Sequence, residues 1–196
     1  MAWLKKEKMD EGQLEILAEA LKKGILVMFR ERTESQVPIK AVMEKKRITE
    51  FMKKMRVTGL DKFTTPSFVS TVNYYANDQD MLKKKTLGAL VVYVEEDYVS
   101  DLLRMFRYPA VDLNNDEALK DACGALANII AGRFKDGMTV LGFADLAMSP
   151  FSNYRNTAMH GVDFYSQELN KYEIVFYIRD TKRLIVELTM GPVNKK

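Results

Sequence analysis

The sequence predicts a single α/β domain of the α+β type, in which an antiparallel-rich sheet is packed on one side by two long helices. Two segments, one over residues 11–32 and one beginning near Asp116, have apolar side chains at the three- and four-residue spacing of helices. Residues 173–190 alternate as a β-hairpin with one buried face does. The 196 residues, 47% of them hydrophobic, suffice for one core, and no repeat or long linker divides residues 1–196.

The N-terminal half contains one clear helix and one region that is hard to interpret. The helix over 11–32 carries its apolar face at Leu14, Leu17, Leu21, Ile25 and Met28. Residues 33–85 are interrupted by two prolines and a glycine, and within them only 68–75 has the composition of a strand, followed by a turn over 76–80. We therefore expect 33–85 to be the most divergent part of the domain, similar to an insertion.

The C-terminal half alternates strands and helices. An apolar strand over 86–94 leads into acidic residues that suit a helix N-terminus, and the helix of 96–106 cannot continue past Pro109. The helix that begins near Asp116 has Asn114 as its predicted N-cap, with Glu117 three positions later in capping-box spacing. The strands expected after it are 140–148, 161–166, 173–179 and 184–190.

This second long helix has one face with almost no bulk. At about 100° per residue, the residues within about 60° of Asn128 are Asp121, Gly124, Ala125, Gly132 and Lys135. The opposite side collects Leu119, Cys123, Leu126, Ile130 and Phe134. Two glycines inside a helix cost about 0.5–1 kcal/mol each relative to alanine. The small residues either permit tight packing within the chain or let another molecule approach the Asn128 amide.

The composition argues against several classes of partner and site. The net charge of +3 is spread over short lysine clusters mixed with acidic and apolar residues, which indicates a solvated surface, without nucleic-acid binding or membrane insertion. The absence of a long apolar run or signal peptide predicts a cytoplasmic protein. Cys123, the single cysteine, is expected in the core, and His160, the single histidine, in a surface or capping role, so no metal site is predicted. The glycines form no dinucleotide or P-loop motif.

The second long helix and its surroundings resemble the CheC/CheX/FliY family of chemotaxis phosphatases, and CheX-like domains in particular. The family motif is an Asp or Ser, then Glu, Asn and Gly on one helix, with a Pro some twenty residues further on. Asp121, Asn128, Gly132 and Pro150 stand at or next to the matching positions, whereas Ala125 occupies the place of the Glu.

The resemblance implies a site and a partner. In the family, the Asn orients the water that hydrolyses the aspartyl phosphate of a CheY-type response regulator, and the Glu pairs with a lysine of that regulator. Asn128 is thus the implied catalytic residue, and Asp121, Gly124, Ala125 and Gly132 are the implied partner-binding residues. No cofactor of the chain's own is implied, because the regulator supplies the divalent cation.

Two functions follow from the resemblance, and a third remains outside it. The chain is either a phosphatase of a phosphorylated CheY-type regulator, or a docking or dimerisation module that has lost catalysis with the motif Glu. The resemblance also makes a homodimer through a sheet edge an expectation. A small α/β protein of unrelated function is the remaining alternative.

Overall fold

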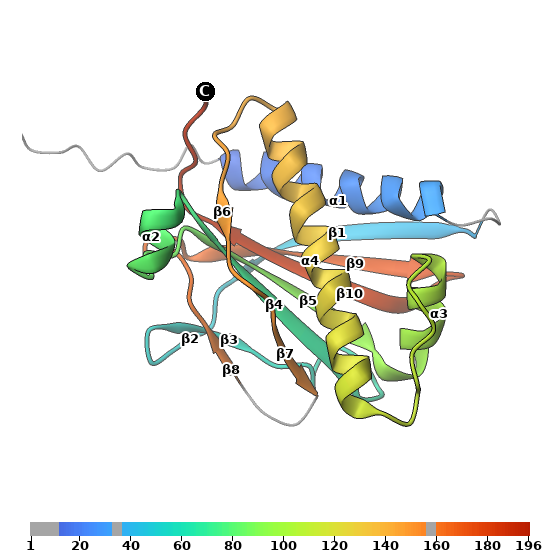
Figure 1. Cartoon of the computed structure of the whole chain (residues 1–196). Coiled ribbons are helices and arrows are strands. Elements are labelled where there is room, and N and C mark those ends of the chain that lie inside the picture. The colour runs from blue at the N-terminus through green and yellow to red at the C-terminus, as the bar shows by residue number, and fades with distance from the viewer. Residues whose placement is uncertain (1–11, 33–36, 156–159) are drawn as a thin grey trace, which may run out of the picture.

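The computed structural model describes residues 12–32, 37–155 and 160–196, and a seven-stranded antiparallel sheet forms its centre (Figure 1). Six strands follow the order β1-β9-β10-β5-β4-β6, and β7 also pairs with β4. The bounds are β1 Ile39–Arg47, β4 Ser67–Tyr75, β5 Gly88–Glu95, β6 Ala147–Met148, β7 Ser152–Arg155, β9 Asn170–Ile178 and β10 Thr181–Met190. The mixture of helices with an antiparallel sheet confirms the predicted fold class.

Two long helices, α1 (Gln13–Arg32) and α4 (Asp116–Val140), pack on one face of this sheet, as the sequence predicted (Figure 1). The apolar stripe predicted for α1 is buried there together with the inward side chains of β4, β5, β9 and β10. The buried Tyr74 hydroxyl of β4 donates a hydrogen bond of 3.1 Å to the Ala131 carbonyl of α4. The main core therefore holds α4 against the strand that lies beneath it.

The opposite face of the sheet is covered by a small second sheet. It contains β2 (Glu50–Phe51), β3 (Lys54–Val57) and β8 (His160–Val162) in the order β2-β3-β8. A second apolar cluster, which includes Met55, Phe63 and Tyr93, lies between the two sheets. Residues 33–85, which were expected to resemble an insertion, thus provide an edge strand, an inner strand and part of this covering layer.

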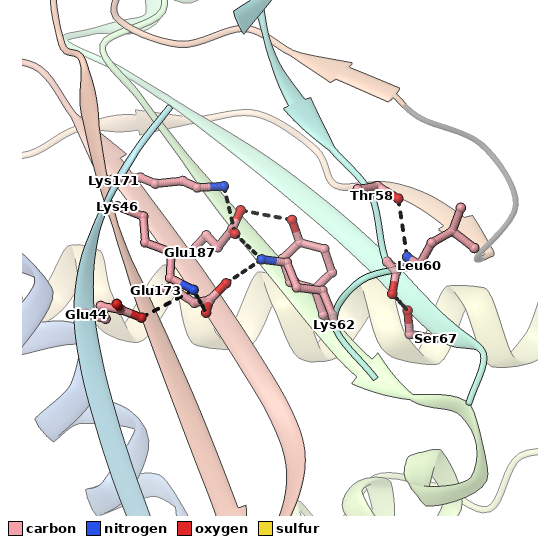
Figure 2. A network of polar contacts seen from close by, with 11 residues as sticks. Glu44, Lys46, Thr58, Leu60, Lys62, Ser67, Lys171, Glu173 and Glu187 are labelled. Atoms are coloured by element: carbon pink, nitrogen blue, oxygen red, sulfur yellow. Dashed lines mark hydrogen bonds and ion pairs between the residues drawn. The ribbon is translucent and has the colours of Figure 1, made fainter. Parts of the chain in front are cut away.

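A buried network of ion pairs connects the 58–66 segment to the face of the main sheet that lies opposite the two long helices (Figure 2). Glu173 and Glu187 are direct neighbours on β9 and β10, an arrangement that would be unfavourable for two unpaired carboxylates. Lys62 binds both, at 2.6 Å from Glu187. Lys46 also binds Glu173 at 2.6 Å, Lys171 binds Glu187 at 2.7 Å, and the Tyr93 hydroxyl donates to Glu187 at 2.9 Å. Each carboxylate is therefore neutralised by two lysines.

Three short helical segments complete the fold: α2 (Asp78–Leu82), η1 (Glu96–Tyr98) and α3 (Val99–Met105). The turn or loop predicted over 76–80 holds only for 76–77, because α2 begins at Asp78, where the Asn77 side chain caps it by accepting a hydrogen bond from the Asp80 amide. None of the helices that the structure describes is long and apolar enough to span a membrane.

Two strand predictions in the C-terminal half were too long. The strand predicted over 140–148 is confined to β6. A turn with Gly142 in the left-handed conformation follows α4, and Phe143 and Ala144 then pair with the C-terminal residues 194–195 instead of with the main sheet. The strand predicted over 161–166 ends with β8 at Val162. The terminal hairpin is confirmed, with Arg179 and Asp180 in the left-handed conformation at its turn.

Candidate functional site

The candidate site lies on α4, a helix whose N-terminus is capped by an asparagine side chain. Asn115, with extended backbone, is the N-cap, and its side chain accepts a hydrogen bond of 3.1 Å from the Ala118 amide. The predicted N-cap, Asn114, is therefore wrong by one residue. Glu117 forms an ion pair with Lys120 instead of closing a capping box.

An arginine of β7 ties the first turn of α4 to the rest of the molecule. Arg155 forms ion pairs with Glu96 of η1 and Asp116 of α4, and its Nε lies 3.0 Å from Glu96. Its guanidinium also lies 5.8 Å from the centre of the Phe68 ring. The sequence alone does not indicate this contact, because β7 and η1 are far apart in the chain. They are brought together through β4, which pairs with β7 and with β5, the strand that precedes η1.

The structure confirms the two faces predicted for α4. The five residues assigned to the apolar side, Leu119, Cys123, Leu126, Ile130 and Phe134, are all buried. Burial raises the pKa of the Cys123 thiol to about 12, so this group stays protonated in the core. Asn128 and Asp121 are exposed on the other side of the helix.

The small residues of the exposed face divide into two kinds. Gly124 is buried, and a Cβ at this position would overlap the Phe151 ring and the Asn153 amide of the segment at β7. Its lack of a side chain thus serves packing within the chain, which corrects its assignment as clearance for a partner. A Cβ at Gly132 would meet no atom of another part of the chain within 4 Å, and Ala125 is half-buried. The clearance around Asn128 is therefore provided at Gly132 and Ala125.

Asn128 and Asp121 keep their polar groups available. Among the residues that the structure describes, neither side chain forms a hydrogen bond or an ion pair. The charged residues nearby on the helix are already paired, Lys120 with Glu117 and Lys135 with Asp145, the latter at 3.3 Å. The surface thus presents one amide that can both donate and accept and one carboxylate that can accept.

Other site chemistry is sparse in the described part of the chain. No group of three or more His, Cys, Asp or Glu side chains there is placed to hold a metal ion. The backbone of His160 pairs with Val57 in the small sheet, while its side chain, for which a surface or capping role was expected, lies outside the described residues. The α4 surface is accordingly the site that the geometry favours.

Comparison with solved structures gives clear matches at low sequence identity. A putative chemotaxis protein of Desulfovibrio vulgaris Hildenborough matches with a TM-score of 0.58 and 14% identity, over 90% of this chain and 97% of that chain. The chemotaxis protein CheX of Desulfovibrio desulfuricans matches with a TM-score of 0.56 and 13% identity, over 90% and 99%. CheX in the CheX–CheY–BeF3–Mg complex of Borrelia burgdorferi matches with a TM-score of 0.52 and 13% identity, over 90% and 98%.

The chain has the CheX-like fold. The resemblance inferred from the residues of α4 is confirmed at the level of the fold, and it extends over nearly the whole chain. Neither a protein-family model nor a curated protein matches the sequence.

Within the CheX-like fold, the motif positions occupy two neighbouring segments. Asp121, Asn128 and Gly132 lie on α4, and Pro150 lies between β6 and β7, directly before the Phe151 that packs on Gly124. Phe151 and Asn153 were not recognised from the sequence. The proline at the motif spacing was the one signal that pointed to this segment, but it did not indicate which helical residue the segment contacts.

Proposed function

We propose that the chain binds a phosphorylated CheY-type response regulator through the exposed face of α4. The observation that carries this proposal is the exposed Asn128 amide, which has no partner among the described residues and lies between Ala125 and Gly132, where little side-chain bulk intervenes. The choice of partner is supported by the CheX–CheY complex of Borrelia burgdorferi, in which CheX has the same fold as this chain. Such a partner places the chain in the cytoplasm.

We further propose that Asn128 promotes hydrolysis of the regulator's aspartyl phosphate, with low efficiency. Its amide would orient a water molecule for attack on phosphorus, releasing inorganic phosphate and the free carboxylate of the regulator. The chain needs no cofactor of its own, because the divalent cation belongs to the regulator. Efficiency is low because Ala125 cannot form the ion pair expected of the motif Glu, and loss of such a pair typically weakens an interface tens- to thousands-fold.

Phosphate release from a phosphorylated regulator tests the catalytic proposal. Wild-type protein should accelerate release slightly, Asn128→Ala should abolish that acceleration, and Ala125→Glu should increase it at least tenfold. The double variant Ala125→Glu/Asn128→Ala should behave as Asn128→Ala alone. Wild-type activity that survives Asn128→Ala would contradict the role of the amide.

Binding is measured separately, because the chain could dock without catalysing. Ala125 favours this second function, a docking module, which predicts binding of the BeF3-activated regulator with no release of phosphate by any variant. Asp121→Asn should weaken this binding, since Asp121 lies about two turns before Asn128 on the same face of α4 and has no ion-pair partner among the described residues. Asp136→Asn is the matched control, because Asp136 is exposed on α4 about two turns beyond Asn128 but about 80° around the helix from it.

A homodimer through β1 is part of the proposal. Among the described strands, β1 pairs only with β9, so its other edge is open along nine residues. An open edge of this length can pair with the same strand of a second copy. Light scattering should report a dimer that Val42→Glu, a change at an exposed position of β1, converts to a monomer.

A further inference from the structure

Two protruding segments lie at the same end of the main sheet. Four antiparallel pairings separate β1 from β4 in the sheet order. The two strands therefore run in the same direction, and their C-terminal ends lie at the same end of the sheet. Beyond the end of β1 the chain forms the β2–β3 hairpin, and beyond the end of β4 it forms α2. Both segments stand out at the left of Figure 1, away from α3 at the opposite end.

Each protrusion exposes large apolar side chains. Phe51 and Met52 at the hairpin are 65% and 82% exposed, and Leu82 at the end of α2 is 82% exposed. Single exposed apolar residues are common on protein surfaces and need no explanation. Here, however, the exposed side chains belong to two separate segments that extend from one end of the molecule.

Lysines directly follow the apolar residues in both segments. The sequence reads Phe51-Met-Lys-Lys54 in the hairpin and Leu82-Lys-Lys-Lys85 after α2, and all five lysines are exposed. Lys54 pairs with Asp163 at 3.3 Å and Lys85 with Asp80 at 3.9 Å, whereas Lys53, Lys83 and Lys84 form no ion pair with the described residues. The same order of side chains, apolar and then basic, therefore occurs twice.

The backbone at these lysines is held in an unfavourable conformation. Met52, Lys53 and Lys84 have φ values of 50°, 62° and 53°, in the left-handed region that favours glycine or asparagine. A two-residue hairpin turn would normally use Asn-Gly at the Met52–Lys53 position. Both segments thus retain a basic residue, and the hairpin an apolar one, at positions where a small residue would suit the backbone better.

We propose that this end of the molecule docks on the surface of an anionic lipid bilayer. Phe51, Met52 and Leu82 would enter the boundary between headgroups and acyl chains, and the lysines beside them, whose long side chains can extend back towards the headgroups, would contact the lipid phosphates. The exposed side chains combine apolar groups with positive charge, which is what the boundary between headgroups and acyl chains of an anionic bilayer binds. A bilayer surface is flat and deformable, so both protruding segments can contact it together, and no groove shaped to fit them is needed.

This docking goes beyond the binding of a regulator and uses different residues. None of the lysines or apolar side chains of the two protrusions belongs to α4. Although each lysine cluster by itself is typical of a solvated surface, the fold brings two of them to one end together with exposed apolar side chains. The chain would thus bind lipid peripherally while the Asn128 face stays available.

Sedimentation of the full chain with vesicles tests the proposal. Wild-type protein should bind vesicles of phosphatidylcholine mixed with phosphatidylglycerol, bind poorly to phosphatidylcholine alone, and lose affinity as salt is added. The double variant Phe51→Ser/Met52→Ser should lose about tenfold or more in affinity. Lys83→Gln and Lys84→Gln should each cost about fivefold. Val140→Ser, at an exposed apolar residue of α4 that is 86% exposed, is the matched control and should bind as wild type.

Fluorescence gives a second measurement that reports insertion directly. The variant Phe51→Trp should shift its emission to shorter wavelength with anionic vesicles, after subtraction of the wild-type signal from Trp3. No binding of wild-type protein to anionic vesicles, or equal losses for Val140→Ser and Phe51→Ser/Met52→Ser, would overturn the proposal. Binding of the polyanion heparin that equals vesicle binding and is unchanged in Phe51→Ser/Met52→Ser would assign the lysines to an acidic macromolecule instead.

Discussion

At Gly124, a hydrogen atom in place of a side chain lets the segment at β7 lie directly against α4. The Phe151 ring and the Asn153 amide occupy the space that a Cβ would need. Gly132, on the same helix, faces open space. The two glycines therefore have different physical roles although both lie near Asn128 on the helical wheel.

The two glycines give opposite predictions for alanine substitution. Gly124→Ala should lower the free energy of unfolding by about 1–3 kcal/mol, because overpacking outweighs the better helix propensity of alanine. Gly132→Ala should raise it by up to about 1 kcal/mol, because only the propensity changes. Urea denaturation measures both, and changes of the same sign would show that Gly124 is not packed as described.

At the scale of one element, α4 depends on the contacts that fix its first turn. Asn115 satisfies the amide of Ala118, while Arg155 draws the Asp116 carboxylate towards β7 and η1. An acidic residue at this end also interacts favourably with the helix dipole. These contacts position the segment that carries Asp121 relative to the sheet.

Neighbouring asparagines allow a matched test of the N-cap. Asn115→Ala should cost about 0.5–2 kcal/mol in the free energy of unfolding, because the Ala118 amide loses its acceptor. Asn114→Ala should cost much less, since only the backbone amide of Asn114 is bonded, to Asp112. Thermal unfolding of the two variants distinguishes them, and a larger loss for Asn114→Ala would move the helix start back by one residue.

At the scale of the whole molecule, the charge network joins the main sheet to the 58–66 segment that crosses it. Burial by itself would raise the pKa of Glu173, but hydrogen bonds from Lys46 and Lys62 outweigh this effect and lower the pKa to about 2. Burial would likewise lower the pKa of Lys62, and attraction to Glu187 and Glu173 raises it instead. Both shifts favour the charged forms of Glu173 and Lys62 at neutral pH.

The lowered pKa of Glu173 predicts a loss of stability in acid. The ordinary pKa is 4.5, so the stabilisation is complete above about pH 5 and disappears as the pH falls towards about 2. It amounts to about 3 kcal/mol, because the unfolded chain takes up a proton that the folded chain resists. Glu173→Gln should lower stability at neutral pH and flatten this acid limb in denaturant titrations, whereas Glu44→Gln, at a largely exposed partner of Lys46, should leave the limb unchanged.

The sequence by itself determined the features that depend on local periodicity. The spacing of Leu126 and Ile130 against Asn128 and Asp121 assigned the two faces of α4 correctly, because a helix repeats every 3.6 residues whatever surrounds it. The alternation of the terminal hairpin predicted β9 and β10, because successive side chains of a strand point to opposite faces of the sheet. The two long helices, the fold class and the position of Asn128 all followed from such patterns.

Only the tertiary structure decided features that join segments far apart in the chain. Three features depend on contacts between distant residues. Gly124 packs on Phe151, and Lys62 bridges Glu173 and Glu187. The third is the role of 33–85, which supplies an edge strand, an inner strand and part of the covering layer. The segment after α4 belongs here too, since Phe143 and Ala144, in a stretch with the composition of a strand, pair with the C-terminal residues 194–195 instead of with the main sheet. Local propensity differs by less than about 1 kcal/mol per residue, so burial of side chains against distant neighbours outweighs it.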